Sequence, residues 1–216
     1  GFVYALTVAK GFMQAQTLSN AVIITADPYS KIMNRRDRDT MAVFGDAAAA
    51  VWLTSQPPGG AIGVGNFGTD GSGAAHLIVE HGGARKPIGG IWADTETPRA
   101  APRLHMNGRA VYGFMMNYVP NSIELALQDN GLSVDDIDYV VPHQASRFML
   151  EAMREVLGVD DAKFVIDLEC HGNTVSSTIP IALSRLEERL GTLDGKTILV
   201  SGFGVGLSWA TNVLRY

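Results

Sequence analysis

The segment Asp138–Ala145, with the sequence DYVVPHQA, is a short apolar run followed by a turn that carries a histidine. Its run of apolar residues, bounded by turn signals, predicts a buried strand. Ser146 is a suitable N-cap, so we expect a helix to follow it and to reach Leu157, where Gly158 ends it. A strand followed by a helix is the repeating unit of α/β folds, so this segment indicates the fold class.

The same alternation of strands and helices extends in both directions from this segment. Downstream, we expect a strand over 164–167, a loop over 168–173, a helix over 177–190, and strands over 197–201 and 207–214 joined by a glycine-rich link. Upstream, the patterns predict helices over 2–17 and 108–130 and strands over 21–26, 47–53 and 76–80. The run at 21–26 is apolar on both faces, which is typical of strands in parallel sheets.

Composition excludes several classes of function. The 216 residues are 46% apolar and 18% charged, enough for one large domain or two small ones, and no apolar run approaches the roughly 20 residues of a membrane span. The net charge is −5, and no basic stripe exists beyond Arg35, Arg36 and Arg38, which argues against nucleic-acid binding. A single cysteine, Cys170, fits a reducing, cytoplasmic location, and the five histidines lack the spacing of a metal site.

Three turns should meet at one edge of the predicted sheet. They carry His143, Asn173 and the glycines of Gly204-Val205-Gly206, and ligands of open α/β sheets bind at this carboxyl edge. A neutral imidazole and a carboxamide can each donate a hydrogen bond to one shared oxygen, and glycines let the backbone approach a ligand. Each turn alone has an ordinary structural explanation; together they predict an active site.

Several strings of this sequence resemble the β-ketoacyl-acyl carrier protein synthase III family, in matching order along nearly all of the chain. They are Asp37-Arg38-Asp39-Thr40, Phe44-Gly45-Asp46, Leu104–Arg109, Val141–Ala145, His171–Thr174 and Gly202–Gly206. The family belongs to the thiolase superfamily, whose fold stacks two similar α/β halves into five layers. The resemblance therefore implies a layered α-β-α-β-α fold, with residues 1–100 as the remainder of the first half and 101–216 as the second half.

The resemblance also implies a decarboxylative Claisen condensation, in fatty acid or polyketide biosynthesis. In the family, a cysteine at the start of a buried helix takes an acyl group from coenzyme A, and a His and an Asn stabilise the enolate that forms when a malonyl thioester loses carbon dioxide. His143 and Asn173 match these two residues, and Gly204-Val205-Gly206 matches an oxyanion loop that acts through backbone N–H groups. Arg38 matches a residue that lies against the adenine of coenzyme A. The residues that match the pantetheine tunnel are Met106, Gly108, Ala145 and Ser146. Phe44 and Phe203 match aromatic residues near the pocket, and core packing is the alternative role for both rings.

No permanently bound cofactor is implied; the substrates are thioesters of coenzyme A or of carrier-protein pantetheine. The family pattern puts the nucleophilic cysteine two residues before Gly1, so we expect a complementary segment or chain that carries it, and a homodimer. Cys170 lies in the loop of Asn173, where the family has no nucleophile. Basic residues that hold acyl carrier protein in the family are replaced by Phe148 and Gly113, although their neighbours Arg147 and Arg109 could partly compensate. This makes the partner doubtful and indicates a relative specialised for coenzyme A thioesters or an unusual carrier.

Two alternatives to the condensing enzyme stay open. The same site could perform acyl transfer or a non-decarboxylative condensation, which product analysis would distinguish. A half-fold of this kind could also be a non-catalytic subunit that stabilises or regulates an active partner. The presence of both His143 and Asn173 argues against that alternative, since a purely structural copy has no need of the pair.

Overall fold

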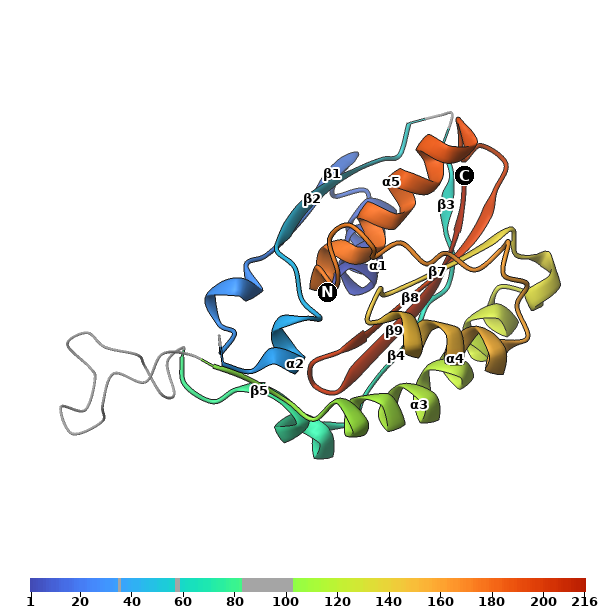
Figure 1. The fold of residues 1–216 in the computed structure, drawn as a ribbon. Coiled ribbons are helices and arrows are strands. Elements are labelled where there is room, and N and C mark those ends of the chain that lie inside the picture. The colour runs from blue at the N-terminus through green and yellow to red at the C-terminus, as the bar shows by residue number, and fades with distance from the viewer. Residues whose placement is uncertain (35, 57–58, 83–102) are drawn as a thin grey trace.

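A five-stranded sheet forms the centre of the molecule (Figure 1). The computed structural model describes residues 1–34, 36–56, 59–82 and 103–216. The strands of the sheet are β3 (Ala61–Ile62), β4 (Asn66–Thr69), β7 (Tyr139–Pro142), β8 (Thr197–Gly204) and β9 (Ser208–Arg215). Their order is β3-β9-β8-β7, with β4 also paired to β9; β7 and β8 are parallel, and β8 and β9 form an antiparallel hairpin.

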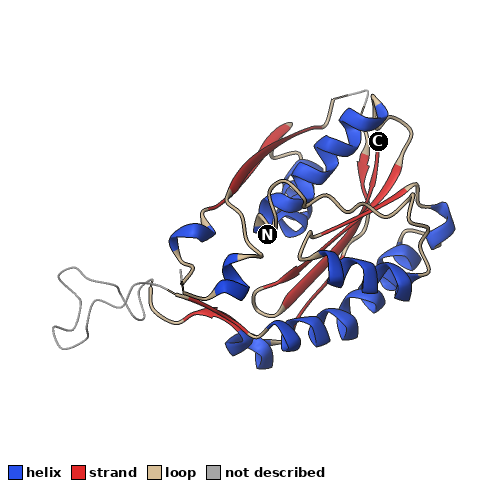
Figure 2. Cartoon of the chain, viewed as in Figure 1, coloured by secondary structure: helices blue, strands red, loops and turns tan. Residues whose placement is uncertain are grey.

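Helices cover both faces of this sheet, and Figure 2 shows the resulting layers. On one face lie α1 (Phe2–Gln14) and α5 (Thr178–Leu190), and on the other lie α3 (Gly108–Asp129) and α4 (Arg147–Leu157). Side chains alternate along β8, so Ile198 and Val200 belong to the core beneath α1 and α5, whereas Leu199 belongs to the core beneath α3 and α4. This alternation is the two-residue period of a strand buried on both sides.

Local capping explains where the helices begin and end. The Asn107 side chain accepts the N–H of Ala110 at 3.1 Å at the start of α3, and Ser146 accepts the N–H of Met149 at 3.4 Å at the start of α4. Gly158 ends α4 with a φ of 63°, a left-handed conformation that glycine adopts without steric cost. The predicted N-cap and C-terminal stop of this helix are therefore confirmed.

A two-stranded ribbon lies beside the helices α1 and α5. It consists of β1 (Asn20–Asp27) and β2 (Ala47–Thr54), which pair antiparallel. The predicted parallel pairing of 21–26 is therefore wrong for β2, the partner strand that the structure describes. Ile23 packs into the core, but Ile24 is 72% exposed and Trp52 is 67% exposed. The segment 21–26 is therefore apolar on both faces because one face packs into the core and the other is an exposed apolar face of the ribbon.

The expected strand over 164–167 is also wrong. Phe164 forms only an isolated parallel bridge with Val140. The side chain of Gln144, which is fully buried, takes the next backbone groups instead: it donates to the carbonyl of Val165 at 3.2 Å and accepts the N–H of Asp167 at 2.7 Å. A side chain thus replaces the backbone ladder that would have extended the strand.

The remaining elements connect the layers. They are the short helix α2 (Arg38–Met41), the antiparallel pair β5 (Leu77–Val79) and β6 (Leu104–Met106), and 3-10 turns at Tyr29–Lys31, Gly71–His76, Val134–Asp136 and Val175–Ser177. The predicted boundary between the halves, at residues 100 and 101, lies outside the described residues; β3 and β4, which precede it, join the sheet of the C-terminal segment. Within the described part of the chain, no helix has the length and apolarity to cross a bilayer, and no three metal-binding side chains gather.

Candidate active site

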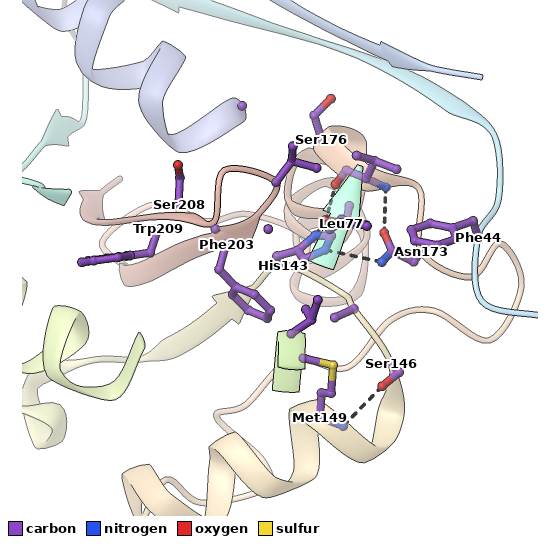
Figure 3. A pocket seen from close by; sticks show the side chains of 18 of the residues that line it. Phe44, Leu77, His143, Ser146, Met149, Asn173, Ser176, Phe203, Ser208 and Trp209 are labelled. Carbon is purple, nitrogen blue, oxygen red and sulfur yellow. Dashed lines mark hydrogen bonds between the residues drawn. The ribbon is translucent and has the colours of Figure 1, made fainter. Parts of the chain in front are cut away.

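A pocket of about 820 Å³ lies at the carboxyl ends of β7 and β8 (Figure 3). The structure brings most of the predicted site residues to its wall: His143, Asn173, Phe44, Met106, Gly108, Ala145, Ser146, Phe203, Gly204 and Val205. Gly206 does not line the pocket, although it belongs to the same turn as Gly204. Arg38 is exposed on α2 and does not line the pocket either.

His143 is positioned by the end of the parallel strand pair. Its backbone N–H donates to the carbonyl of Ser201 on β8 at 2.7 Å, so the ladder between β7 and β8 continues to the histidine itself. The ring of Phe203 meets the imidazole edge to face, with the centroids 5.3 Å apart. Figure 3 shows both rings on the same side of the pocket. The imidazole is therefore held from its backbone and from one face.

Thr178, at the start of α5, contacts Nδ1 of this imidazole. Its hydroxyl oxygen lies 2.7 Å from Nδ1 of His143 and 2.9 Å from the carbonyl oxygen of Val175. A hydroxyl has one proton, so it serves one of these acceptors at a time. When the hydroxyl donates to Nδ1, Nε2 carries the imidazole proton and can donate into the pocket; when it donates to Val175, Nε2 is left as an acceptor.

Burial keeps His143 neutral. Desolvation is the largest cause that lowers the pKa of His143 to about 4, and the backbone of Val175 opposes it. A charged imidazole is disfavoured where protein replaces water. At pH 7 the ring is therefore a neutral hydrogen-bonding group and not a cation.

Asn173 is fixed by backbone and side-chain hydrogen bonds. Its N–H donates to the carbonyl of Val43, and its carbonyl accepts the N–H of Gly45, both at 2.9 Å. Oδ1 accepts the N–H of Val175 at 2.9 Å, which leaves Nδ2 facing Nε2 of His143 at 3.5 Å. Figure 3 shows the two polar ends directed toward each other. A Cβ at position 45 would collide with the carbonyl of His171, so only glycine allows this close approach.

The glycine-rich turn between β8 and β9 brings Gly204 and Val205 to the wall of the pocket. Gly204 and Gly206 have φ values of 152° and 141°, which side chains rarely adopt. Val205 between them has an ordinary backbone conformation, and its side chain is exposed and lines the pocket. A Cβ at Gly206 would collide with Ser208.

The mouth of the pocket is aromatic and carries charged side chains, among them the exposed Arg109, which lines the pocket. Phe148 is 69% exposed and lies against the ring of Tyr112, with the centroids 5.4 Å apart. Its neighbour Arg147 forms ion pairs with Glu169 at 2.6 Å and with Glu151 at 3.8 Å. Arg147 is thus already paired within the chain. Cys170 is exposed on the loop before Asn173 and does not line the pocket.

Sequence reasoning missed several residues whose side chains contact the predicted site residues. Thr178 and Gln144 contact the two predicted turns, yet nothing local distinguishes them from an ordinary helix start and a turn residue. Asp27 and Ser176 also line the pocket, and both the backbone and the hydroxyl of Ser176 donate to Asp27. The signal that could have indicated Thr178 is its place one helical turn after the Asn173 loop, which brings a hydroxyl close to the same sheet edge.

Comparisons with known proteins agree with this arrangement. A family model described as 3-oxoacyl-[acyl-carrier-protein] synthase III matches residues 1–71, and a model of the C-terminal part of the same family matches residues 127–216. The chain is 34% identical to β-ketoacyl-[acyl-carrier-protein] synthase III of Clostridium acetobutylicum, over 100% of this chain and 65% of the relative. A homologue from Deinococcus radiodurans, synthase III 2, is also 34% identical, with 62% of it covered.

Solved structures give the same result. A 3-oxoacyl-(acyl-carrier-protein) synthase III superposes with a TM-score of 0.91 at 36% identity, covering 100% of this chain and 66% of that one. The enzyme of Thermus thermophilus superposes with a TM-score of 0.88 at 31% identity, covering 100% of this chain and 65% of that one. These superpositions confirm the thiolase-like α/β fold that the resemblance implied.

The chain spans 65% of the length of the Clostridium acetobutylicum relative. The two matching family models begin at residue 1 and end at residue 216 of this chain. The similarity to these relatives covers the whole of this chain. The resemblance noted from the sequence motifs is thereby confirmed, and the chain belongs to the 3-oxoacyl-[acyl-carrier-protein] synthase III family.

Proposed function

We propose that this chain supplies the enolate-stabilising half of a condensing enzyme. The observation that carries the proposal is the pair of neutral polar groups, Nε2 of His143 and Nδ2 of Asn173, which lie 3.5 Å apart at the wall of a largely apolar pocket. In the tautomer that has its proton on Nε2, both groups are donors. Two such donors stabilise an oxygen that gains negative charge far better than water-exposed groups do. The curated relatives are named β-ketoacyl-[acyl-carrier-protein] synthases, which supports the same reaction class.

The reaction begins with a malonyl thioester whose carbonyl oxygen accepts hydrogen bonds from both donors. The bond to the carboxylate breaks, carbon dioxide leaves, and the electron pair of that bond forms the enolate. The enolate carbon then attacks the carbonyl carbon of an enzyme-bound acyl thioester. The resulting tetrahedral oxyanion is held by backbone N–H groups of the turn Gly204-Val205-Gly206, and its collapse expels the thiolate.

The acyl group in this proposal is carried by a cysteine upstream of Gly1. Gly1 lines the pocket at the start of the 13-residue helix α1, together with Phe2 and His143. The partial positive charge at a helix N-terminus favours a thiolate over a thiol, so this is a suitable place for a nucleophile. Arg38, outside the pocket, keeps its proposed role on the adenine of coenzyme A.

A complementary segment that carries this cysteine would also cover the exposed apolar side of α1 and the ribbon. The exposed large apolar residues there are Tyr4, Val8, Phe12, Val22, Ile24 and Trp52. Exposed apolar side chains in such numbers are typical of a protein–protein interface. We propose in addition that the completed protein is a homodimer, as the family resemblance implies.

Coenzyme A thioesters are the extender donors that the pocket mouth favours. Arg147 is paired with Glu169 and Glu151, which reduces the positive charge that it offers an acidic carrier protein, while a second cation, Arg109, lines the pocket. The exposed Phe148 adds an apolar contact instead. Carrier-protein thioesters remain the second candidate donor, and a comparison of malonyl-coenzyme A with malonyl-carrier protein as donors decides between them.

The test of the reaction class uses the chain joined to its nucleophile-bearing segment. Replacing His143 or Asn173 by Ala should lower the decarboxylation of malonyl-coenzyme A by about 10²–10³-fold, because each removes one donor to the enolate oxygen. Asn117→Ala, on the exposed face of α3, is the matched control. Product analysis distinguishes condensation from simple acyl transfer, and unchanged turnover in both variants would favour a non-catalytic subunit.

A further inference from the structure

The oxyanion turn is fastened at its base to a second loop. Asp70, which follows β4, donates its N–H to the carbonyl of Leu207 at 2.8 Å and accepts the N–H of Leu207 at 3.1 Å. Leu207 directly follows Gly206, and it is almost completely buried. This reciprocal pair of backbone hydrogen bonds therefore sets where the turn leaves β8 and enters β9.

The carboxylate of Asp70 is itself held from two sides. Oδ1 accepts the backbone N–H of Ser72 at 3.0 Å and the Ser72 hydroxyl at 2.5 Å. Oδ2 accepts the phenol O–H of Tyr118, on α3, at 2.9 Å. These bonds keep the pKa of Asp70 below its usual range, with the Ser72 hydroxyl as the largest cause and the Tyr118 hydroxyl next. The ionised carboxylate is thus a fixed anchor for the loop.

Tyr118 links this anchor to the pocket wall. Its ring stacks on Trp209 with the centroids 4.5 Å apart and the planes at 20°. Trp209 lines the pocket, two residues after Leu207. Gly68 opposes Trp209 across the strand pair, and a Cβ there would collide with the indole ring. Tyr118 therefore contacts Asp70 through its hydroxyl, and Trp209, in the segment that follows the oxyanion turn, through its ring.

We propose that Tyr118 is a positioning residue for the oxyanion turn, acting through Asp70. Its O–H bond to Asp70 holds the backbone of Leu207, so that the N–H groups of Gly204–Gly206 are aimed at the tetrahedral oxyanion of acyl transfer. Tyr118 itself does not line the pocket. This inference rests on the proposed function, and it separates the acyl-transfer step, which uses the turn, from decarboxylation, which uses His143 and Asn173.

The decisive variant is Tyr118→Phe in the chain joined to its nucleophile-bearing segment, because it keeps the ring stack and removes one hydroxyl. We expect kcat for acyl-enzyme formation from acyl-coenzyme A to fall about five- to tenfold with KM unchanged, a smaller effect than direct loss of an oxyanion donor. Malonyl-coenzyme A decarboxylation should stay unchanged. Tyr139→Phe, a half-buried phenol on β7, is the matched control. Equal losses in both steps, or no loss in either, would overturn the inference.

A second measurement keeps the inference testable apart from activity. In this chain, amide hydrogen exchange at Leu207 should accelerate about fivefold in Tyr118→Phe, while the thermal unfolding midpoint changes little, because the variant loosens a local clamp. Unchanged exchange at Leu207 would count against the clamp. If the unmodified protein neither forms an acyl-enzyme nor decarboxylates malonyl-coenzyme A, the proposed function fails, and the exchange rate alone decides whether the clamp exists.

Discussion

The central sheet and the β1–β2 ribbon differ in how much of their surface the chain itself covers. The sheet has helices on both faces, and its middle strand, β8, has side chains that are buried almost throughout. The ribbon is covered on one face only, although its sequence is equally apolar. Apolar residues are therefore buried inside the sheet, whereas the ribbon exposes part of its apolar residues on the surface of this chain.

The largest expected effect is a difference in the free energy of unfolding between one substitution in the sheet and one in the ribbon. Ile198 on β8 is 0% exposed and Ile24 on β1 is 72% exposed. Ile198→Asp buries an unpaired charge and should cost about 4–5 kcal/mol or more, enough to unfold most domains of this size. Ile24→Asp should cost about 1 kcal/mol at most, because only strand propensity changes. Chemical denaturation of the two variants measures the contrast.

The same pair of variants also tests the role of the ribbon. Ile24→Asp should prevent association with the nucleophile-bearing segment, since a charge would replace the apolar contact at the interface. Ala50→Ser, at the position opposite Ile24 in the ribbon, is a mild control that adds no charge. If Ile24→Asp binds the segment as tightly as the unmodified chain, the exposed face of the ribbon is not the interface.

How much of this arrangement the sequence predicts depends on the range of the interaction. The strand, turn and helix around His143 follow from residues within one turn of each other, so their prediction succeeded. The convergence of His143 and Asn173 follows from the rule that turns at one sheet edge meet. These are local patterns or general topological rules, and a single sequence contains both.

What the sequence did not predict depends on contacts between distant residues. Gln144 ends the 164–167 run by binding its backbone, and Thr178 binds His143 across 35 positions. Tyr118 reaches Asp70 across 48 positions. Neither hydroxyl has a local pattern that indicates its partner. The antiparallel ribbon was missed for a related reason: an apolar strand has the same pattern whether its cover is internal or supplied by another chain.

Inside the sheet edge, the next expected effect comes from Thr178. Thr178→Val keeps the shape and removes the hydroxyl beside Nδ1 of His143, so the tautomer that has its proton on Nε2 loses the hydroxyl proton that Nδ1 can accept. We expect malonyl-coenzyme A decarboxylation to fall about tenfold, with Thr192→Val as the control at an exposed hydroxyl. Nitrogen NMR shifts of His143 report the tautomer directly. An unchanged tautomer together with unchanged decarboxylation would show that the imidazole is oriented by other contacts.

Burial of His143 predicts an unusual pH dependence. With a pKa of about 4 in place of 6.5, the imidazole stays neutral down to about pH 5, so decarboxylation at pH 5.5 should exceed by about tenfold that expected for an ordinary histidine donor. The folded state binds fewer protons than the unfolded chain between pH 6.5 and 4. Stability from this group is therefore full above pH 6.5 and declines as the pH falls through that window.

An NMR titration of the His143 ring measures this value directly. Exposed His105 serves as the internal reference in the same spectrum. A midpoint near 6.5 for His143 would mean that water reaches the imidazole freely. The edge of the sheet would then be as exposed to solvent as the outer face of the ribbon.

The smallest expected effect lies at the pocket mouth, the other outward-facing region. Phe148→Arg adds a charge beside Arg147, whose own charge is already paired with Glu169 and Glu151. We expect KM for malonyl-carrier protein to fall about threefold at low salt and to lose this gain at high salt, because rim charges act mainly by steering. Malonyl-pantetheine, which lacks the carrier, should be used equally well by both proteins. Phe148→Leu adds no charge but also loses the ring contact with Tyr112, so it distinguishes the effect of the charge from the effect of the lost contact. An equal fall in KM in that variant would mean that the aromatic ring obstructs the carrier protein and that the added charge is not the cause.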